Sequence, residues 1–388
     1  MVTLSSADNA LKSLYLGVVA NQLNTEINPL FAKIGQTTSD VWGKEIRKLA
    51  PYGINGGIGA GTEDGDLPIP SQNNYVQFVL TLKNLFGTIE ISDKAIRASQ
   101  HSSGAFVDLL AAEMEGLIRA SKFNFGRMLF GDGSGKLCKI ISQTSNVLYV
   151  DNVQNLMEGM VVEILSSTTK QVVVPAKRIV SIDRENNLAL LEDRSIPTNT
   201  ATADDIVVVQ GSYNNELTGL GAIFGNTDKL YGLNRMDHKW LAPIKSTVSA
   251  INDVAIQKAM DNLEDICGNQ PDFIVCSSGV KRAYQNYLIT NRSNVDVMNL
   301  QGGYKALSYN GIPLVSDRFA PKGTMYILNT KDFHLHQLCD WRWLEGDDGR
   351  VIKQVANKPV YKATLVKYAD MICDRPNGQA VITGITEA

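Results

Sequence analysis

The spacing of hydrophobic and polar positions predicts a hairpin arm early in this chain. Phe78, Leu80 and Leu82 alternate with polar neighbours in the stretch YVQFVLTLK, the period of a strand with one buried face. A partner strand is expected at about residues 44–49, and the segment between the two is rich in glycine, proline and asparagine. A two-stranded arm is at best marginally stable alone in water, so we expect it to pack against other chains.

The tip of this arm is predicted to be compliant and acidic. It contains several glycines within ten residues, followed by three carboxylates, and no lysine between Lys48 and Lys83. Such a tip can adapt to a neighbouring subunit and be steered by its cations. The residues expected to contact another subunit are Gly56, Gly57, Gly59, Gly61, Glu63, Asp64 and Asp66.

A different period follows the arm and predicts a long amphipathic helix. Apolar residues recur at steps of three and four from Ser102 or Ser103, either of which can cap a helix, to the sequence FGDGSG. A helix of about 26 residues would span roughly 40 Å. Its expected packing residues are Phe106, Leu110, Met114, Leu117, Phe125 and Met128.

The remaining patterns predict an α+β protein with several parts. Residues 1–43 suggest an arm with a short amphipathic helix, and residues 137–216 contain five short apolar runs typical of a small β-barrel or sandwich. Residues 217–322 alternate between helical periods, near 246–266 and 278–290, and a buried strand at 273–276, which indicates an α/β unit. Residues 323–388 are again strand-like, including GDDG as a turn.

Composition limits the classes of function. The 388 residues are 44% hydrophobic, enough for a large core, and the net charge of −3 excludes a strongly basic protein that binds mainly phosphate backbones. The five cysteines are odd in number and never form a CxxC pair, as expected for reduced thiols of a cytosolic protein. The N-terminal stretch matches neither a signal peptide nor a membrane span.

Motifs that resemble catalytic or binding sites have simpler interpretations. FGDGSGK ends a helix, and Lys136 is followed by Leu137, so it indicates a helix stop and turn rather than a phosphate-binding loop. His334 and His336 could share a metal but lack a third ligand marked by spacing. Cys276 and Ser278 lie at a strand-to-helix junction without GxSxG, where Ser278 would serve as a helix N-cap. No catalytic, cofactor or metal residues are predicted.

Trp341 and Trp343 are two positions apart on a predicted strand. Such a pair could stack on a base or a sugar, but strand tryptophans more often pack in a core. We therefore expect packing.

The order of these parts resembles the major capsid proteins of tailed bacteriophages, the family with the HK97-like fold. The resemblance is carried by FGTIEISDKAI, RMLFGDGSG, TGLGAIFG and NGIPLVSDRFAPKGTMYILNTKDF. It implies six parts, which are an N-terminal arm (1–43), an extended loop (44–92), a peripheral domain with a spine helix (93–136), an inserted β-domain (137–216), an axial α/β domain (217–322) and a peripheral sheet with the C-terminus (323–388).

What the resemblance implies about function is assembly. Copies would form hexamers and pentamers of an icosahedral head in the virion, assembled in the bacterial cytoplasm around double-stranded DNA that is bound without sequence specificity. A portal protein would be a partner, and no membrane is involved. Whether a decoration protein binds is left open. Some relatives crosslink through a loop lysine or carry a long charged N-terminal extension. Because this chain has neither, we expect no crosslink and a separate scaffolding protein.

Three alternatives remain at this stage. An encapsulin-like nanocompartment resembles the same fold, a cytosolic hydrolase would use Cys276 or Ser278, and a phage tail or decoration protein would contain mostly strands.

Overall fold

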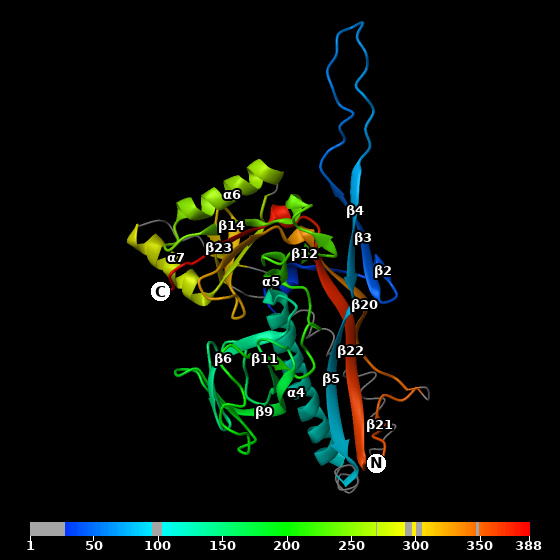
Figure 1. The fold of residues 1–388 in the computed structure, drawn as a ribbon, viewed down its shortest axis with the longest axis vertical. Coiled ribbons are helices and arrows are strands. Elements are labelled where there is room, and N and C mark those ends of the chain that lie inside the picture. The colour runs from blue at the N-terminus through cyan, green and yellow to red at the C-terminus, as the bar shows by residue number, and fades with distance from the viewer. Residues whose placement is uncertain (1–27, 95–102, 269, 292–296, 300–304, 347–348) are drawn as a thin grey trace.

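The computed structural model describes residues 28–94, 103–268, 270–291, 297–299, 305–346 and 349–388. Figure 1 shows a hairpin arm that rises from the body, a long sheet accompanied by one helix, a barrel beside that helix, and a second sheet covered by helices. Most of the predicted N-terminal arm, including its short helix, lies outside the described residues. None of the helices in the described ranges has the length and apolarity that crossing a bilayer requires.

The arm is an antiparallel ribbon of β3 (Glu45–Tyr52) and β4 (Asn74–Thr81), joined near the body by β2 (Val41–Trp42). Its register places Glu45 opposite Thr81 and Tyr52 opposite Asn74. Ile46, Phe78 and Leu80 are buried along one face, as the alternation predicted. Beyond Tyr52 the chain continues to residue 73 without strand pairing.

A five-stranded sheet forms the long axis of the body. β5 (Lys83–Ser92) pairs with β22 (Val360–Cys373), which pairs with β20 (Phe333–Trp343) and with the short β21 (Lys353–Gln354). β1 (Gly35–Thr37) pairs with β20 in parallel. On β5, Leu85, Ile89 and Ile91 are buried, because alternate side chains of a strand point to one face.

Helix α4 (Ser103–Phe130) runs beside β5 and β22 (Figure 1). Its 28 residues span about 42 Å. It crosses β5 at Gly87, where a Cβ would lie 2.7 Å from Leu117 Cδ1, so glycine permits the close approach. The helix ends at Phe130, which confirms the predicted stop before GDGSG.

The barrel follows α4. Its strands are β6 (Lys136–Thr144), β7 (Val147–Val150), β8 (Val161–Leu165), β9 (Val172–Asp183), β10 (Leu188–Leu191) and β11 (Ile206–Val209). They close in the order β10-β7-β6-β11-β8-β9 around an apolar core of their own. Of the predicted barrel or sandwich, the structure shows the barrel, but the expected five strands are wrong, because β6 was missed. Its register shifts between Ile140 and Ser142, so its apolar residues do not alternate.

The second sheet is mixed and has seven strands. In order these are β14 (Ile244–Thr247), β23 (Ala380–Thr383), β19 (Met325–Leu328), β15 (Phe273–Cys276), β18 (Ile312–Ser316), β17 (Lys305–Tyr309) and β16 (Val297–Asn299). Helices α6 (Asp253–Cys267) and α7 (Ser278–Thr290) cover it. β19 and β23 lie within residues 323–388. The sequence analysis assigned all of these residues to the peripheral sheet.

The helix expected over 246–266 begins later. Ser246 and Thr247 belong to β14, which pairs with β23, and the helix starts after Asn252, whose side chain accepts a hydrogen bond from Ala255 N. Shorter elements connect these parts, namely η2 (Phe31–Lys33), α5 (Leu220–Ile223), β12 (Lys229–Leu230), β13 (Leu233–Asn234), η3 (Lys239–Leu241), η4 (Thr330–Asp332) and η5 (Pro376–Gly378).

Candidate intersubunit interface

The root of the arm is held by aromatic packing. Tyr52 on β3 stacks on Trp240 with ring centroids 5.4 Å apart, and Phe78 on β4 lies 5.1 Å from the ring of Tyr231. The backbone continues this contact, since Val79 N donates to Tyr231 O at 3.0 Å. The direction of the arm is therefore fixed where it leaves the body.

A charged cluster fastens the other side of the root. Lys48 Nζ of β3 lies 2.8 Å from the Asp374 carboxylate, and His334 Nδ1 lies 3.4 Å from the same carboxylate. His336 Nδ1 lies 3.0 Å from Ser39 O, and burial lowers the pKa of this histidine. The rings of His334 and His336 are 6.3 Å apart, and no metal-binding group of three side chains occurs in the described part of the chain. Their contacts are those of structural histidines.

The tip, residues 53–73, lies entirely in solvent. All seven predicted contact residues, from Gly56 to Asp66, are exposed there. The tip forms a few internal hydrogen bonds, such as Asn55 Nδ2 to Asn73 Oδ1 at 3.1 Å and Gly57 N to Asn55 Oδ1 at 2.9 Å. These bonds give the tip a local shape without attaching it to the body.

The tip also exposes apolar side chains that sequence reasoning missed. Ile54, Ile58, Leu67 and Ile69 are each 79–89% exposed. Single exposed apolar residues are ordinary, whereas these four lie within 16 residues on one projection and are covered by no described residue of the chain. The signal in the sequence was the presence of large aliphatic residues within a stretch otherwise made of glycine, proline and acid.

The predicted packing residues of the long helix differ in how deeply they are buried. Met114, Phe125 and Met128 are buried and Leu117 is half-buried. Phe125 contacts the ring of Phe31 at 5.0 Å in an edge-on geometry. The side chains of Phe106 and Leu110 lie outside the described residues.

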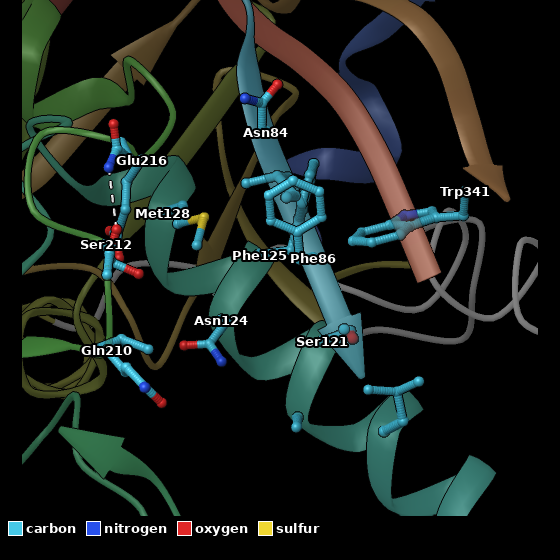
Figure 2. Close-up of a pocket in the computed structure, with 17 residues that line it drawn as sticks. Asn84, Phe86, Ser121, Asn124, Phe125, Met128, Gln210, Ser212, Glu216 and Trp341 are labelled. Atoms are coloured by element: carbon cyan, nitrogen blue, oxygen red, sulfur yellow. Dashed lines mark hydrogen bonds between the residues drawn. The ribbon is translucent and has the colours of Figure 1, made fainter. Parts of the chain in front are cut away.

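A cavity of about 220 Å³ lies between α4, β5 and the segment that leaves the barrel. Figure 2 shows Asn84 and Phe86 of β5, Ser121 and Asn124 of α4, and Gln210 around it.

Trp341 and Trp343 are each no more than 5% exposed, and the ring centroids of Trp341 and Phe125 are 6.3 Å apart. They pack in the core, as expected.

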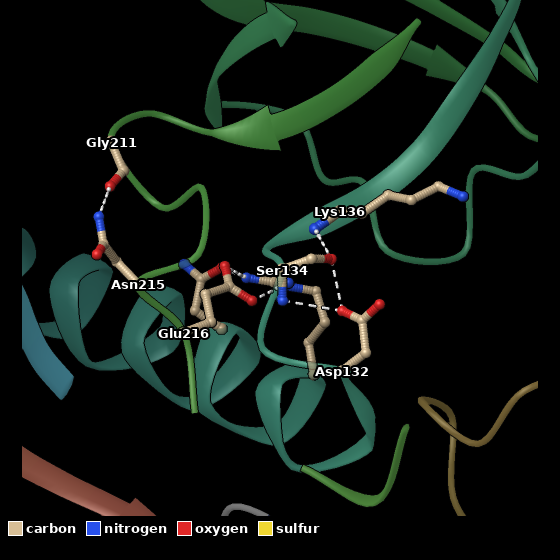
Figure 3. A network of polar contacts seen from close by, with 8 residues as sticks. Asp132, Ser134, Lys136, Gly211, Asn215 and Glu216 are labelled. Atoms are coloured by element: carbon tan, nitrogen blue, oxygen red, sulfur yellow. Dashed lines mark hydrogen bonds and ion pairs between the residues drawn. The ribbon is translucent and has the colours of Figure 1, made fainter. Parts of the chain in front are cut away.

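The GDGSG sequence forms the turn that joins α4 to the barrel (Figure 3). Asp132 Oδ1 accepts hydrogen bonds from Ser134 N at 2.9 Å and Ser134 Oγ at 2.5 Å, and Ser134 Oγ accepts one from Lys136 N. Gly135 has φ +78°, and a Cβ there would lie 2.6 Å from Ser212 O. Glycine at position 135 therefore permits both the turn and the close approach of the Ser212 backbone.

A buried ion pair fixes this junction. Arg127 donates two hydrogen bonds to Glu216, at 2.8 and 2.5 Å, and both side chains are less than 5% exposed. Sequence reasoning missed the pair because its members are 89 residues apart. It ties the exit of the barrel to the long helix.

Of the two candidate nucleophiles, Cys276 lies in the core and Ser278 is the exposed first residue of α7. Cys276 is buried, burial raises its pKa to about 12, and its Sγ lies 3.7 Å from Val315 O. The N-cap of α7 is Ser277, so the N-cap expected at Ser278 is wrong by one residue. Ser277 Oγ contacts Glu387, whose carboxylate also accepts a bond from Gly323 N at 2.9 Å. Thiols activated for attack have lowered pKa values, whereas Cys276 shows the opposite.

Comparisons with known proteins identify the fold. No protein-family model and no curated protein matches the chain. Among solved structures, a chain of the cyanophage A-1(L) capsid asymmetric unit is 14% identical, with a TM-score of 0.55 over 97% of this chain and 94% of that chain. The holo-SrpI encapsulin complex from Synechococcus elongatus matches at 10% identity with a TM-score of 0.49, over 95% of each chain. The α+β fold predicted from the sequence, HK97-like, is confirmed.

Proposed function

We propose that this protein is a major capsid protein, a structural subunit whose copies assemble into hexamers and pentamers of an icosahedral bacteriophage head. The observation that carries the proposal is the exposure of the arm tip. Residues 53–73 are all exposed, and they include four large apolar side chains that do not pack on the rest of the chain. The fold shared with the cyanophage capsid chain supports it.

Assembly follows physically from the exposed tip. Moving an isoleucine or leucine from water into an apolar contact contributes about 1.5–3 kcal/mol, part of which offsets the freedom lost on association. An arm that reaches another copy gains this contribution, and each copy can both give and receive an arm. Many such contacts must break together before a subunit leaves, so the shell is expected to dissociate slowly.

The proposed partners follow from this role. The shell would form with a separate scaffolding protein, hold a portal at one vertex and enclose double-stranded DNA without sequence-specific contacts. The net charge of −3 supports a wall that does not grip the phosphate backbone during packing. The protein would assemble in the host cytoplasm and reside in the virion, and its role would be structural rather than catalytic.

The test is the state of the expressed full-length protein. Sedimentation velocity and electron microscopy, with the chain alone and with a co-expressed scaffolding protein, should show capsomers or closed particles. A compact monomer at every concentration under both conditions would refute the proposal. The neighbouring genes separate the two shell types, since terminase, portal and tail genes indicate a phage head and a single cargo enzyme indicates a nanocompartment.

A further inference from the structure

Three asparagines in this chain precede a glycine, and the structure holds each of the three pairs differently. They are Asn55, Asn310 and Asn377. In such a pair the backbone nitrogen of the glycine can attack the side-chain amide of the asparagine, because glycine has no Cβ to hinder the approach and adopts many backbone conformations. The attack also requires that the backbone be free to turn. The three pairs therefore serve as comparisons for one another.

Asn310 lies in a tight turn between two paired strands. Its φ is +49° and that of Gly311 is +78°, and the residues on either side, Tyr309 and Ile312, are cross-strand partners in β17 and β18. Positive φ at both central residues is the geometry of a type I′ hairpin turn. Because the strand pairing fixes this geometry, Gly311 N is not free to turn toward the side chain of Asn310.

Asn377 lies in η5, where the neighbouring nitrogen is already engaged. Gly378 is buried, and its N–H donates to Arg375 O at 3.0 Å. A buried nitrogen that donates a hydrogen bond keeps both its proton and its position. Attack on the Asn377 amide would therefore require local unfolding first.

Asn55 differs from both, because it lies in the arm tip beyond the last strand pair, Tyr52 with Asn74. Asn55 and Gly56 are exposed, and Gly56 N donates to no atom of the residues that the structure describes. Only the side chain of Ser71 would come within 4 Å of a Cβ on Gly56, at 3.4 Å. The nitrogen of Gly56 is therefore accessible to hydroxide, and no packing or strand pairing confines it.

The tip also polarises the amide that would be attacked. Asn55 Oδ1 accepts a hydrogen bond from Gly57 N at 2.9 Å, and Asn55 Nδ2 donates one to Asn73 Oδ1 at 3.1 Å. Attack at Cγ places negative charge on Oδ1, and a backbone N–H directed at that oxygen stabilises the charge as the donors of an oxyanion hole do. Neither hydrogen bond engages the nitrogen of Gly56.

We infer that Asn55 is a site of spontaneous deamidation in the free subunit. Gly56 N loses its proton to hydroxide and forms a bond to Asn55 Cγ. The bond between Cγ and Nδ2 then breaks, and the nitrogen leaves as ammonia after taking a proton from water, which regenerates the hydroxide. The product is a five-membered succinimide ring. Water opens this ring at either carbonyl carbon and gives aspartate or isoaspartate, so an amide and water become a carboxylate and ammonium without any oxidation.

Deamidation changes the tip in two ways. The only charged residues of the tip are three carboxylates, so conversion of Asn55 adds a fourth negative charge. The new carboxylate has no hydrogen to donate, so the link to Asn73 Oδ1 across the base of the tip is lost. The inference concerns the free subunit and stands independently of the proposed shell function.

Peptide mapping of the full-length protein tests this inference. Free subunits, separated from any particles by size-exclusion chromatography, are incubated at mildly alkaline pH. They are then digested and analysed by mass spectrometry with electron-transfer fragmentation, which distinguishes aspartate from isoaspartate. Asn55 should convert at least about tenfold faster than Asn310 and Asn377, which corresponds to about 1.4 kcal/mol or more in the barrier. A smaller difference from either asparagine would overturn the inference.

Two substitutions in the tip form a matched pair. Gly56→Ala adds a methyl group to the residue that carries the attacking nitrogen and should slow the conversion of Asn55 at least about tenfold. Gly61→Ala makes the same change where the new Cβ would lie 3.7 Å from Asp66 O, and it should leave the rate within about twofold. Equal rates of conversion in the two variants would show that Gly56 N is not the attacking group and would overturn the mechanism.

Discussion

Asp370 on β22 illustrates how burial of one carboxylate makes stability depend on pH. Its oxygens accept hydrogen bonds from Thr218 N at 2.7 Å, Thr218 Oγ1 at 3.0 Å and Met371 N at 2.8 Å. Burial nevertheless raises its pKa to about 6, above the ordinary value of 3.8. The folded state thus holds this proton more tightly than the unfolded state does, and stability is lost as pH rises through the interval between the two values.

We expect the free energy of unfolding of the unmodified protein to fall by about 2 kcal/mol, relative to Asp370→Asn, between pH 4 and pH 7. The amide keeps an acceptor for Thr218 N and does not titrate. Urea unfolding at four pH values measures the difference. Asp204→Asn, at a carboxylate whose side chain is 70% exposed, is the control and should leave the slope unchanged. Parallel curves for the protein and Asp370→Asn would contradict the assignment.

At the scale of elements, the end of α4 depends on a close approach by the segment that follows the barrel. A Cβ on Gly219 would lie 2.6 Å from Gly131 O and 2.7 Å from Leu129 O, both backbone atoms that cannot move aside. Gly219→Ala should therefore cost at least about 2 kcal/mol of unfolding free energy. Gly116 lies in α4, and a Cβ there would have no atom within 4 Å. Gly116→Ala should therefore raise the unfolding free energy by about 0.5–1 kcal/mol. Thermal unfolding of the two variants compares them directly, and equal shifts would show that the junction is not tightly packed.

The elements also show what the sequence can predict. The 3.6-residue period of α4 and the short apolar run of β15 were sufficient to predict these two elements, because each has a local sequence pattern. β6 was missed because its register shift breaks the alternation. Ser246 and Thr247, the last two residues of β14, were taken for helix because their strand character comes from pairing with β23, more than 130 residues away. Long-range pairings of this kind, like Arg127 with Glu216, have no local signature.

At the scale of the whole molecule, the residues that stabilise the fold are separate from the exposed apolar residues of the tip. The core clusters of the sheets and the barrel contain none of the apolar residues of the tip. Replacing Ile54, Ile58, Leu67 and Ile69 together by serine should leave the unfolding free energy within about 0.5 kcal/mol, since exposed substitutions away from packing rarely change more. The same variant should lose assembled particles, because the contribution of about 1.5–3 kcal/mol per buried side chain is removed from every contact.

The matched control replaces exposed apolar residues of the barrel, Tyr149, Val172 and Val180, by serine. We expect this variant to assemble, because these side chains lie on the barrel rather than on the arm. Sedimentation measures assembly and urea unfolding measures stability on the same preparations. If the tip variant unfolded at a lower urea concentration, the tip would contribute to its own fold, and if it assembled as well as the control, arm exchange would not hold the copies together. Loss of assembly with stability unchanged is the result expected for an arm that contacts another copy rather than its own chain.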